Sequence, residues 1–201
     1  MRRIEKPKED EYTPYAIQYI GLLPNDALVL DHLQKNIEAT RAFLLSLPED
    51  KLLYRYAANK WTVKEIVLHI ADDERIYLYR ALRFARHDTT ELPGFDQDEY
   101  TRYSGANHRT LDDLLDELAT VRKATLSFYN GIGGETLTRV GVASGNVMSV
   151  RAIAYHIAGH ELRHMNIIRE RYISTEPLAT VPCAPAEHNK SDRSITSLFQ
   201  P

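Results

Sequence analysis

The segment "VRAIAYHIAGHELRHMNIIRERY", residues 150–172, decides the fold class, because its apolar residues recur at helical spacing along its whole length. This spacing predicts a long helix with one apolar face. Ser149 stands directly before the segment, and serine is a typical residue at the start of a helix. The chain therefore contains a helix that is long enough to form one side of a bundle.

Three other segments show the same helical spacing. The first covers residues 26–47, with Asn25 as its N-cap. The second covers residues 62–87 and begins with the capping-box sequence "TVKE". The third covers residues 110–130 and ends at a glycine-rich stretch. Because no segment alternates convincingly over the length of a strand, the sequence predicts an all-α fold, a four-helix bundle.

The connection between the second and third helices, residues 88–110, determines the topology. Its 23 residues reach about 76 Å when extended, whereas the second helix is only about 39 Å long. The connection can therefore return along the whole bundle, which predicts one long crossover. The second helix is then parallel to the third and antiparallel to the fourth. A small hairpin around Ser144-Gly145-Asn146 is a further prediction.

The length of 201 residues predicts one domain. We expect this domain to cover residues 1–173, with residues 1–25 as an N-terminal extension of the bundle. Residues 174–201 are rich in proline and serine and show no periodicity, so they are predicted to form an irregular tail.

The composition excludes several classes of function. With 25 basic and 28 acidic residues and a net charge of -3, the chain lacks the basic excess of a nucleic-acid-binding protein. No apolar run approaches the roughly 20 residues of a membrane helix. The single cysteine, Cys183, excludes an internal disulfide, and no apolar stretch follows the first residues as in a secretory signal. We therefore expect a cytoplasmic protein that contacts neither nucleic acid nor membrane.

Three histidines of the fourth helix, His156, His160 and His164, form one stripe, because residues four apart lie about 40° and 6 Å from each other. Zn–N bonds of about 2.0–2.1 Å keep ligand nitrogens close together. Neighbouring members of the stripe can meet this condition, whereas the outer pair, about 12 Å apart along the axis, cannot. His160 therefore belongs to either candidate pair.

The same stretch spells H-E-x-x-H across His160, Glu161 and His164, the pattern of a zinc peptidase in which the glutamate activates water. The extended form of that motif fails, because Ile167 and Glu170 stand where a glycine and a third histidine are required. The sequence also predicts no strand that could hold an extended peptide. A peptidase is therefore the weaker interpretation.

A third ligand is available upstream, on the second helix. His69 lies next to an apolar face, and antiparallel packing brings it level with the C-terminal half of the fourth helix. This favours His69, His160 and His164 as three ligands that leave a metal position open, as catalytic sites do. Asp73 or Asp72 could orient an imidazole from behind, although a solvated acidic patch explains them equally well.

Three stretches resemble the DinB superfamily, in particular its YfiT-like branch: "KWTVKEIVLHIADDERIYLYRALRFARHD", "LPGFDQDEY" and "ASGNVMSVRAIAYHIAGHELRHMNIIRERY". The resemblance covers roughly residues 11–172. It implies a bundle of up-down-down-up topology and a homodimer. It also implies one divalent metal, zinc or nickel, held by a histidine of the second helix and an H-x-x-x-H pair of the fourth, which are here His69, His160 and His164.

The resemblance also implies a class of activity. Relatives include S-transferases that use a low-molecular-weight thiol such as bacillithiol, thiol-dependent isomerases, and proteins described as metal-dependent hydrolases. An open metal position can lower the pKa of a bound thiol or of water. We therefore predict a metal-dependent enzyme that adds a small thiol to an electrophile. The alternatives are a hydrolase that uses metal-activated water and a non-catalytic binding module stabilised by its metal.

Other residues are weaker candidates for the site. Arg80 and Arg83 could pair with carboxylates of a thiol cosubstrate, although a solvated helix face is the simpler interpretation. Trp61 is expected to act as a hydrophobic staple before the second helix. The sequence "LPGFDQDEY" contains three residues that could line a substrate cleft: Phe95, Asp96 and Tyr100.

Overall fold

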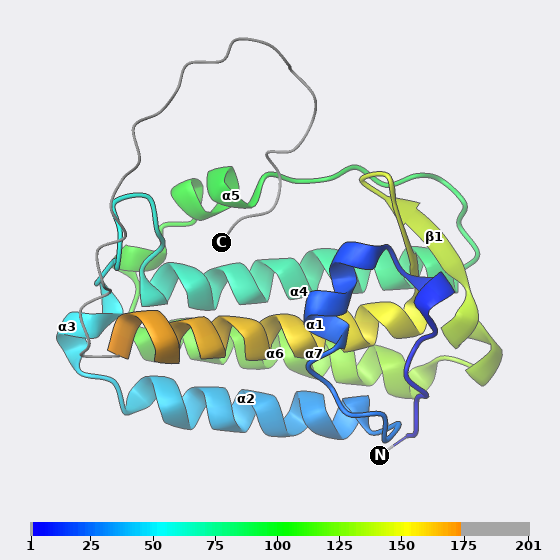
Figure 1. The fold of residues 1–201 in the computed structure, drawn as a ribbon, viewed down its shortest axis with the longest axis horizontal. Coiled ribbons are helices and arrows are strands. Elements are labelled where there is room, and N and C mark those ends of the chain that lie inside the picture. Colours follow the sequence, from blue (N-terminus) through cyan, green and yellow to red (C-terminus); the bar gives the residue numbers. More distant parts are fainter. Residues whose placement is uncertain (1, 174–201) are drawn as a thin grey trace, which may run out of the picture.

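The computed structural model describes residues 2–173 of the chain. Four long helices form the body of the molecule (Figure 1): α2 Val29–Leu45, α4 Val63–Ala85, α6 Leu111–Gly131 and α7 Val150–Ile167. The prediction of an all-α four-helix bundle is therefore confirmed. The predicted irregular tail, which includes Cys183, lies outside the described residues.

Helices α4, α6 and α7 begin where the sequence predicts, because each has a side chain that caps its first turn. The Thr62 hydroxyl accepts a hydrogen bond from the Glu65 backbone N–H at 3.1 Å, and the Glu65 carboxylate accepts one from the Thr62 N–H at 2.7 Å. Thr110 and Ser149 each accept from the N–H three residues further on. These caps satisfy N–H groups that a helix leaves unpaired, and so fix the ends of the helices that carry the site.

Helix α2 departs from the prediction, because it begins at Val29 and Asn25 is not its N-cap. The Asp26 carboxylate instead accepts from the backbone N–H two residues on at 2.9 Å, and Ala27 adopts a φ of +61°. This stretch therefore forms a turn that delays the helix. Helix α7 also ends before the predicted position, and the chain continues from it in π-helical form over Ile168–Ile173.

The contacts between helices establish the topology. His69 of α4 faces His164 of α7, with ring centroids 5.0 Å apart, whereas Tyr77 two turns later stacks on His156 at 3.9 Å. Residue numbers therefore rise along α4 as they fall along α7, which makes the two helices antiparallel. Figure 1 shows α4 and α6 parallel to each other, with the connection between them returning along the bundle. The predicted crossover and up-down-down-up topology are confirmed.

Apolar side chains from all four helices fill the interior. Leu33 of α2, Ile70 of α4, Leu118 of α6 and Ile153 of α7 are among the buried residues. Removing such side chains from water contributes about 25 cal/mol per Å² of apolar surface. The stripe of histidines on α7 is also buried, so polar side chains interrupt this core where α7 faces α4.

Two short antiparallel strands confirm the predicted hairpin: β1 Val140–Ala143 and β2 Asn146–Ser149. Ser144 and Gly145 form the turn with φ values of +53° and +71°, as a tight two-residue hairpin requires. The backbone N–H of Leu92 donates to a β1 carbonyl at 3.0 Å. The hairpin therefore holds the start of the crossover in place beside the ends of α4 and α7.

Shorter helical elements occupy the connections: η1 Glu9–Glu11, η2 Pro14–Ala16, α1 Ile17–Ile20, α3 Glu49–Leu52, α5 Gln97–Tyr103, η3 Ala106–His108 and η4 Gly134–Thr138. Helix α1 lies against α7 at Gly159, where a Cβ atom would stand 2.1 Å from the carbonyl oxygen of Tyr19. Only glycine permits this close approach. Within residues 2–173, no helix combines the length and the apolar character needed to cross a membrane.

Candidate metal centre

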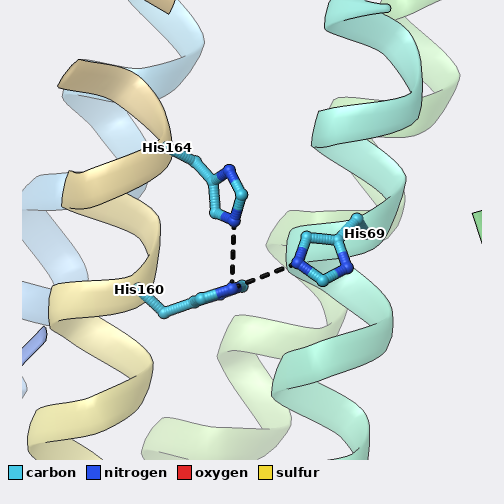
Figure 2. A group of neighbouring side chains, drawn as sticks. All are labelled: His69, His160 and His164. Carbon is cyan, nitrogen blue, oxygen red and sulfur yellow. Dashed lines mark hydrogen bonds between the residues drawn. The ribbon is translucent and has the colours of Figure 1, made fainter. Parts of the chain in front are cut away.

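His69, His160 and His164 form one cluster between α4 and α7 (Figure 2). The Nε2 atom of His160 lies 3.1 Å from Nε2 of His69 and 3.1 Å from Nε2 of His164. One ring nitrogen from each of the three histidines lies within 4.8 Å of the other two. The structure thus brings together the three residues that the sequence predicts as ligands.

The spacing of these nitrogens matches that of ligands on a single metal ion. Two nitrogens bound to one tetrahedral zinc ion at about 2.0–2.1 Å are about 3.3–3.4 Å apart. The observed 3.1 Å between ring nitrogens is about 0.2 Å shorter, so a small shift of the rings would admit the ion. Hydrogen bonding alone leaves the cluster incomplete, because the Nε2 atom of a neutral imidazole either donates or accepts, and that of His160 has two nitrogen neighbours. A shared cation would satisfy all three lone pairs.

Burial keeps the three imidazoles neutral. It lowers the pKa of His69 and of His160 well below the usual histidine value, and the neighbouring histidines disfavour a charge on either ring further. Burial, followed by the charge of Arg163, lowers the pKa of His164 to about 3. Protonation is therefore disfavoured at neutral pH, and each ring keeps a lone pair. Neutral imidazole is the form that binds a metal.

Two further buried polar residues, Asp73 and His156, lie beside His160. The Oδ2 atom of Asp73 is 3.4 Å from Nδ1 of His160 and 3.6 Å from Nε2 of His156. Among the described residues, neither this oxygen nor either ring nitrogen of His156 has a hydrogen-bond partner. Native proteins rarely leave buried polar atoms in this state, so the region has unused binding capacity.

Of the two predicted orienting carboxylates, the structure places Asp73, and not Asp72, next to an imidazole. The Oδ1 atom of Asp72 accepts a hydrogen bond from Nη1 of Arg75 at 3.1 Å. Burial raises the pKa of the Asp72 carboxyl, while Arg75 acts in the opposite direction. Asp72 therefore belongs to a surface ion pair on another side of α4.

Glu161 faces away from the histidine cluster, about 100° around α7 from His160. Its carboxylate is fully buried. It accepts a hydrogen bond from the Thr40 hydroxyl at 2.7 Å and pairs with Nη2 of Arg122 at 2.8 Å. Arg122 also binds the carboxylate of Glu74. A glutamate held in this network cannot reach a water molecule at the histidine cluster. The structure therefore removes the basis of the peptidase interpretation of H-E-x-x-H.

A cavity of about 460 Å³ borders the histidine cluster, and His160 and His164 form part of its lining. The wall is built from α4 and α7 together with three connecting regions: the N-terminal segment with Tyr19, the crossover with Phe95, and the hairpin turn with Ser144. This volume is within the usual range of a small-molecule site. The cavity therefore gives a substrate access to the cluster.

Several residues that the sequence names as weaker candidates lie at this cavity. Phe95 and Asp96 line it, whereas the side chain of Tyr100 is exposed. Arg80 also lines it and is buried, so the prediction of a solvated helix face is wrong for this residue. Arg83, in contrast, pairs with Asp88 near the surface.

Trp61 has a larger role than the predicted hydrophobic staple. Its ring centroid lies 4.6 Å from that of His69 and 6.3 Å from that of His164. Its Nε1–H donates to Oδ1 of Asp98 at 3.0 Å, which ties it to the crossover. Trp61 therefore packs against two of the three candidate ligands and forms part of the cavity wall.

The contribution of the N-terminal segment is absent from the sequence prediction. Tyr19 of α1 makes edge contacts with His156 and His160, with ring centroids 4.7 and 5.5 Å apart. Burial, followed by the charge of Asp73, raises the pKa of Tyr19 to about 12, so it stays neutral. The signal in the sequence was Gly159, because a glycine inside a helical pattern often marks a close approach by another segment.

Comparison with known proteins agrees with this architecture. The sequence model of the DinB superfamily matches residues 32–168. The chain belongs to the DinB superfamily. The three clustered histidines lie within the matched span, whereas the segment that carries Tyr19 lies before it. One wall of the cavity is therefore built by residues outside the matched DinB region.

A solved DinB-like fold supports the topology. YfiT from Bacillus subtilis, described as a probable metal-dependent hydrolase with an unusual four-helix bundle topology, superimposes with a TM-score of 0.60. The alignment covers 82% of this chain and 90% of YfiT, at 16% sequence identity. Likeness at this level of identity establishes a shared fold. No protein of curated function matches the chain in sequence.

Proposed function

We propose that this DinB protein is a divalent-metal-dependent enzyme whose metal is held by His69, His160 and His164. The observation that carries the proposal is the convergence of three buried imidazole nitrogens, with two separations of 3.1 Å, at the edge of a cavity. Zinc and nickel both accept imidazole ligands. The description of YfiT as a probable metal-dependent hydrolase points in the same direction.

Three protein ligands leave at least one metal position for another molecule. A metal held by the three histidines would supply Lewis acidity. It would lower the pKa of a thiol or of water bound at the open position and so provide a nucleophile near neutral pH. The cavity provides room for a substrate beside that position. Trp61 and Tyr19 cover the histidines from two sides and so limit the access of bulk water.

Asp73 contributes by orienting His160. Its carboxylate lies 3.4 Å from Nδ1 of that ring, which favours the tautomer with the proton on Nδ1. The lone pair of Nε2, which points toward the other two histidines, then remains available. Asp73 also lines the cavity, and its Oδ2 atom accepts no hydrogen bond from the described residues.

We further propose that the nucleophile is a low-molecular-weight thiol, such as bacillithiol, which is transferred to an electrophilic partner. Resemblance to thiol-dependent DinB proteins supports this choice. A cavity of about 460 Å³ accommodates a thiol cosubstrate together with a small electrophile. The second candidate is a hydrolase, which the description of YfiT favours.

A titration of cobalt-substituted protein with small thiols tests this proposal. Sulfur ligation should change the visible spectrum of the bound cobalt, and thiol conjugation to an alkyl halide or epoxide should disappear in His69→Ala. His108→Ala is the matched control, because His108 is exposed and away from the cluster. An unchanged spectrum together with hydrolysis of esters or amides would replace the transferase by the hydrolase. Unfolding on metal removal, without either activity, would favour the binding module.

A further inference from the structure

Arg80 is a buried cation beside the cavity. Its side chain is 7% exposed, and Nη2 donates to the Pro93 carbonyl oxygen at 3.3 Å. Among residues 2–173, no carboxylate forms an ion pair with it. Buried arginines are normally paired, as Arg122 is with two glutamates. Arg80 therefore has no carboxylate of residues 2–173 in direct contact with its guanidinium.

The guanidinium of Arg80 is held at the cavity by aromatic rings. It lies 4.7 Å from the ring centroid of Tyr77 and 5.9 Å from that of Phe95, and both rings line the cavity together with Arg80. Contact with two rings restricts the long side chain, so less entropy is lost when a ligand binds. A guanidinium has five N–H donors, of which one is used by Pro93. The others are available to a molecule in the cavity.

The acidic residues of the crossover do not serve as a counter-charge for Arg80. The Asp96 carboxylate accepts from the backbone N–H of Asp98 at 2.9 Å and from that of Glu99 at 3.1 Å. The Asp98 carboxylate accepts from the indole of Trp61 at 3.0 Å. Both carboxylates therefore have local partners within the wall.

Arg80 and the histidine cluster lie within the reach of one small molecule. A path of ring contacts leads from Arg80 to Tyr77 at 4.7 Å, from Tyr77 to His156 at 3.9 Å, and from His156 to His160 at 5.7 Å, so the ends are no more than about 14 Å apart. His69 and Arg80 also lie within about 20° of each other around α4, because the helix turns about 100° per residue. His69 and Arg80 therefore face the same side of α4.

We propose that Arg80 binds a carboxylate of the substrate or cosubstrate, so that the reacting group of the same molecule lies at the histidine cluster. This inference rests on the proposed metal-dependent function and specifies its substrate class: small molecules with a carboxylate at one end and a nucleophilic or metal-binding group at the other. A guanidinium matches a carboxylate through two parallel hydrogen bonds. Arg80 is then a specificity-determining residue.

The test compares pairs of thiols of equal length on cobalt-substituted protein. One member of each pair is an ω-mercaptocarboxylate and the other is an ω-mercaptoalcohol. The carboxylate should bind more tightly by on the order of 10- to 100-fold, with an optimum chain length, because it gains charge-assisted hydrogen bonds. Arg80→Gln should remove the difference, and Arg80→Lys should restore part of it. Arg83→Gln is the matched control, since Arg83 pairs with Asp88 at the surface and should leave the preference intact.

The outcomes separate this inference from the proposed function. Equal affinity of the two thiols in the unmodified protein overturns the carboxylate subsite, although sulfur ligation is still observed. If no thiol changes the cobalt spectrum, the thiol proposal fails, and Arg80 is then tested by calorimetric titration of the zinc-loaded protein with adipate. Adipate binding that Arg80→Gln weakens supports the subsite. Absent binding, or binding that the variant leaves unchanged, overturns it.

Discussion

The two sides of α7 carry buried polar clusters that differ in one respect. On one side, Glu161 is bound by Thr40 and Arg122, and Arg122 is bound in addition by Glu74. On the other side, Asp73 and His156 include atoms without hydrogen-bond partners among the described residues. Both clusters are buried, but only the incomplete one borders the cavity. We infer that the complete cluster stabilises the fold and that the incomplete one receives a group from outside the chain.

The largest expected effect is on metal binding by the incomplete cluster. His164→Ala should lower the affinity for a divalent metal by more than about 100-fold, because loss of a direct ligand exceeds the effect of losing an outer partner. His156→Ala is the matched control from the same stripe and should leave most of the metal bound, since its ring stacks on Tyr77 outside the cluster. Metal analysis after dialysis measures both. The reverse pattern would show that His156 and His160 form the ligand pair.

The second effect is on the stability that the complete cluster gives to the fold. Arg122→Ala should lower the free energy of unfolding by about 3–5 kcal/mol, because it leaves two buried glutamates without their cation. Arg41→Ala is the matched control: Arg41 joins α2 to α6 through Asp116 and Asp112, but 40% of its side chain is exposed, so the loss should be about 0–1 kcal/mol. Urea unfolding of the metal-free proteins measures both. Equal losses for the two variants would contradict a structural role for the buried network.

The smallest expected effect is on the stability of the metal-free protein when His156 is replaced. His156→Phe in metal-free protein should change the free energy of unfolding by no more than about 1 kcal/mol, and in the stabilising direction, because an apolar ring replaces a buried imidazole without hydrogen bonds. Leu33→Ala, at a fully buried apolar position, should instead cost about 2–5 kcal/mol. Thermal unfolding measures the pair. A loss for His156→Phe as large as that for Leu33→Ala would mean that His156 belongs to a satisfied structural cluster.

Much of the fold could be predicted because local signals agree with the tertiary packing. Thr62, Thr110 and Ser149 cap their helices as their sequences indicate. The start of α2 was predicted incorrectly, because Asp26 uses its side chain to form a turn. Side chains of this kind can stabilise a cap or a turn, and the sequence alone does not choose between them.

The candidate ligands could be predicted in part from spacing and in part from resemblance. His160 and His164 follow from helical geometry, and His69 follows from the relative direction of two helices. The role of Arg80 could not be derived in this way. Arg80 and Arg83 are alike in sequence, and only the position of the crossover buries one of them while the other pairs with Asp88.

The sequence by itself determined the four helices, their caps, the stripe of histidines and the length of the crossover, because these depend on residues that are close together in the chain or on chain length. Only the tertiary structure decided which face of α7 meets α4. It placed Glu161 with Arg122 and the histidines with Asp73. It also brought Tyr19 and Trp61 to the cluster from separate segments. The physical reason is that burial and hydrogen-bond satisfaction depend on all neighbours of a side chain, and most of these neighbours are distant in sequence.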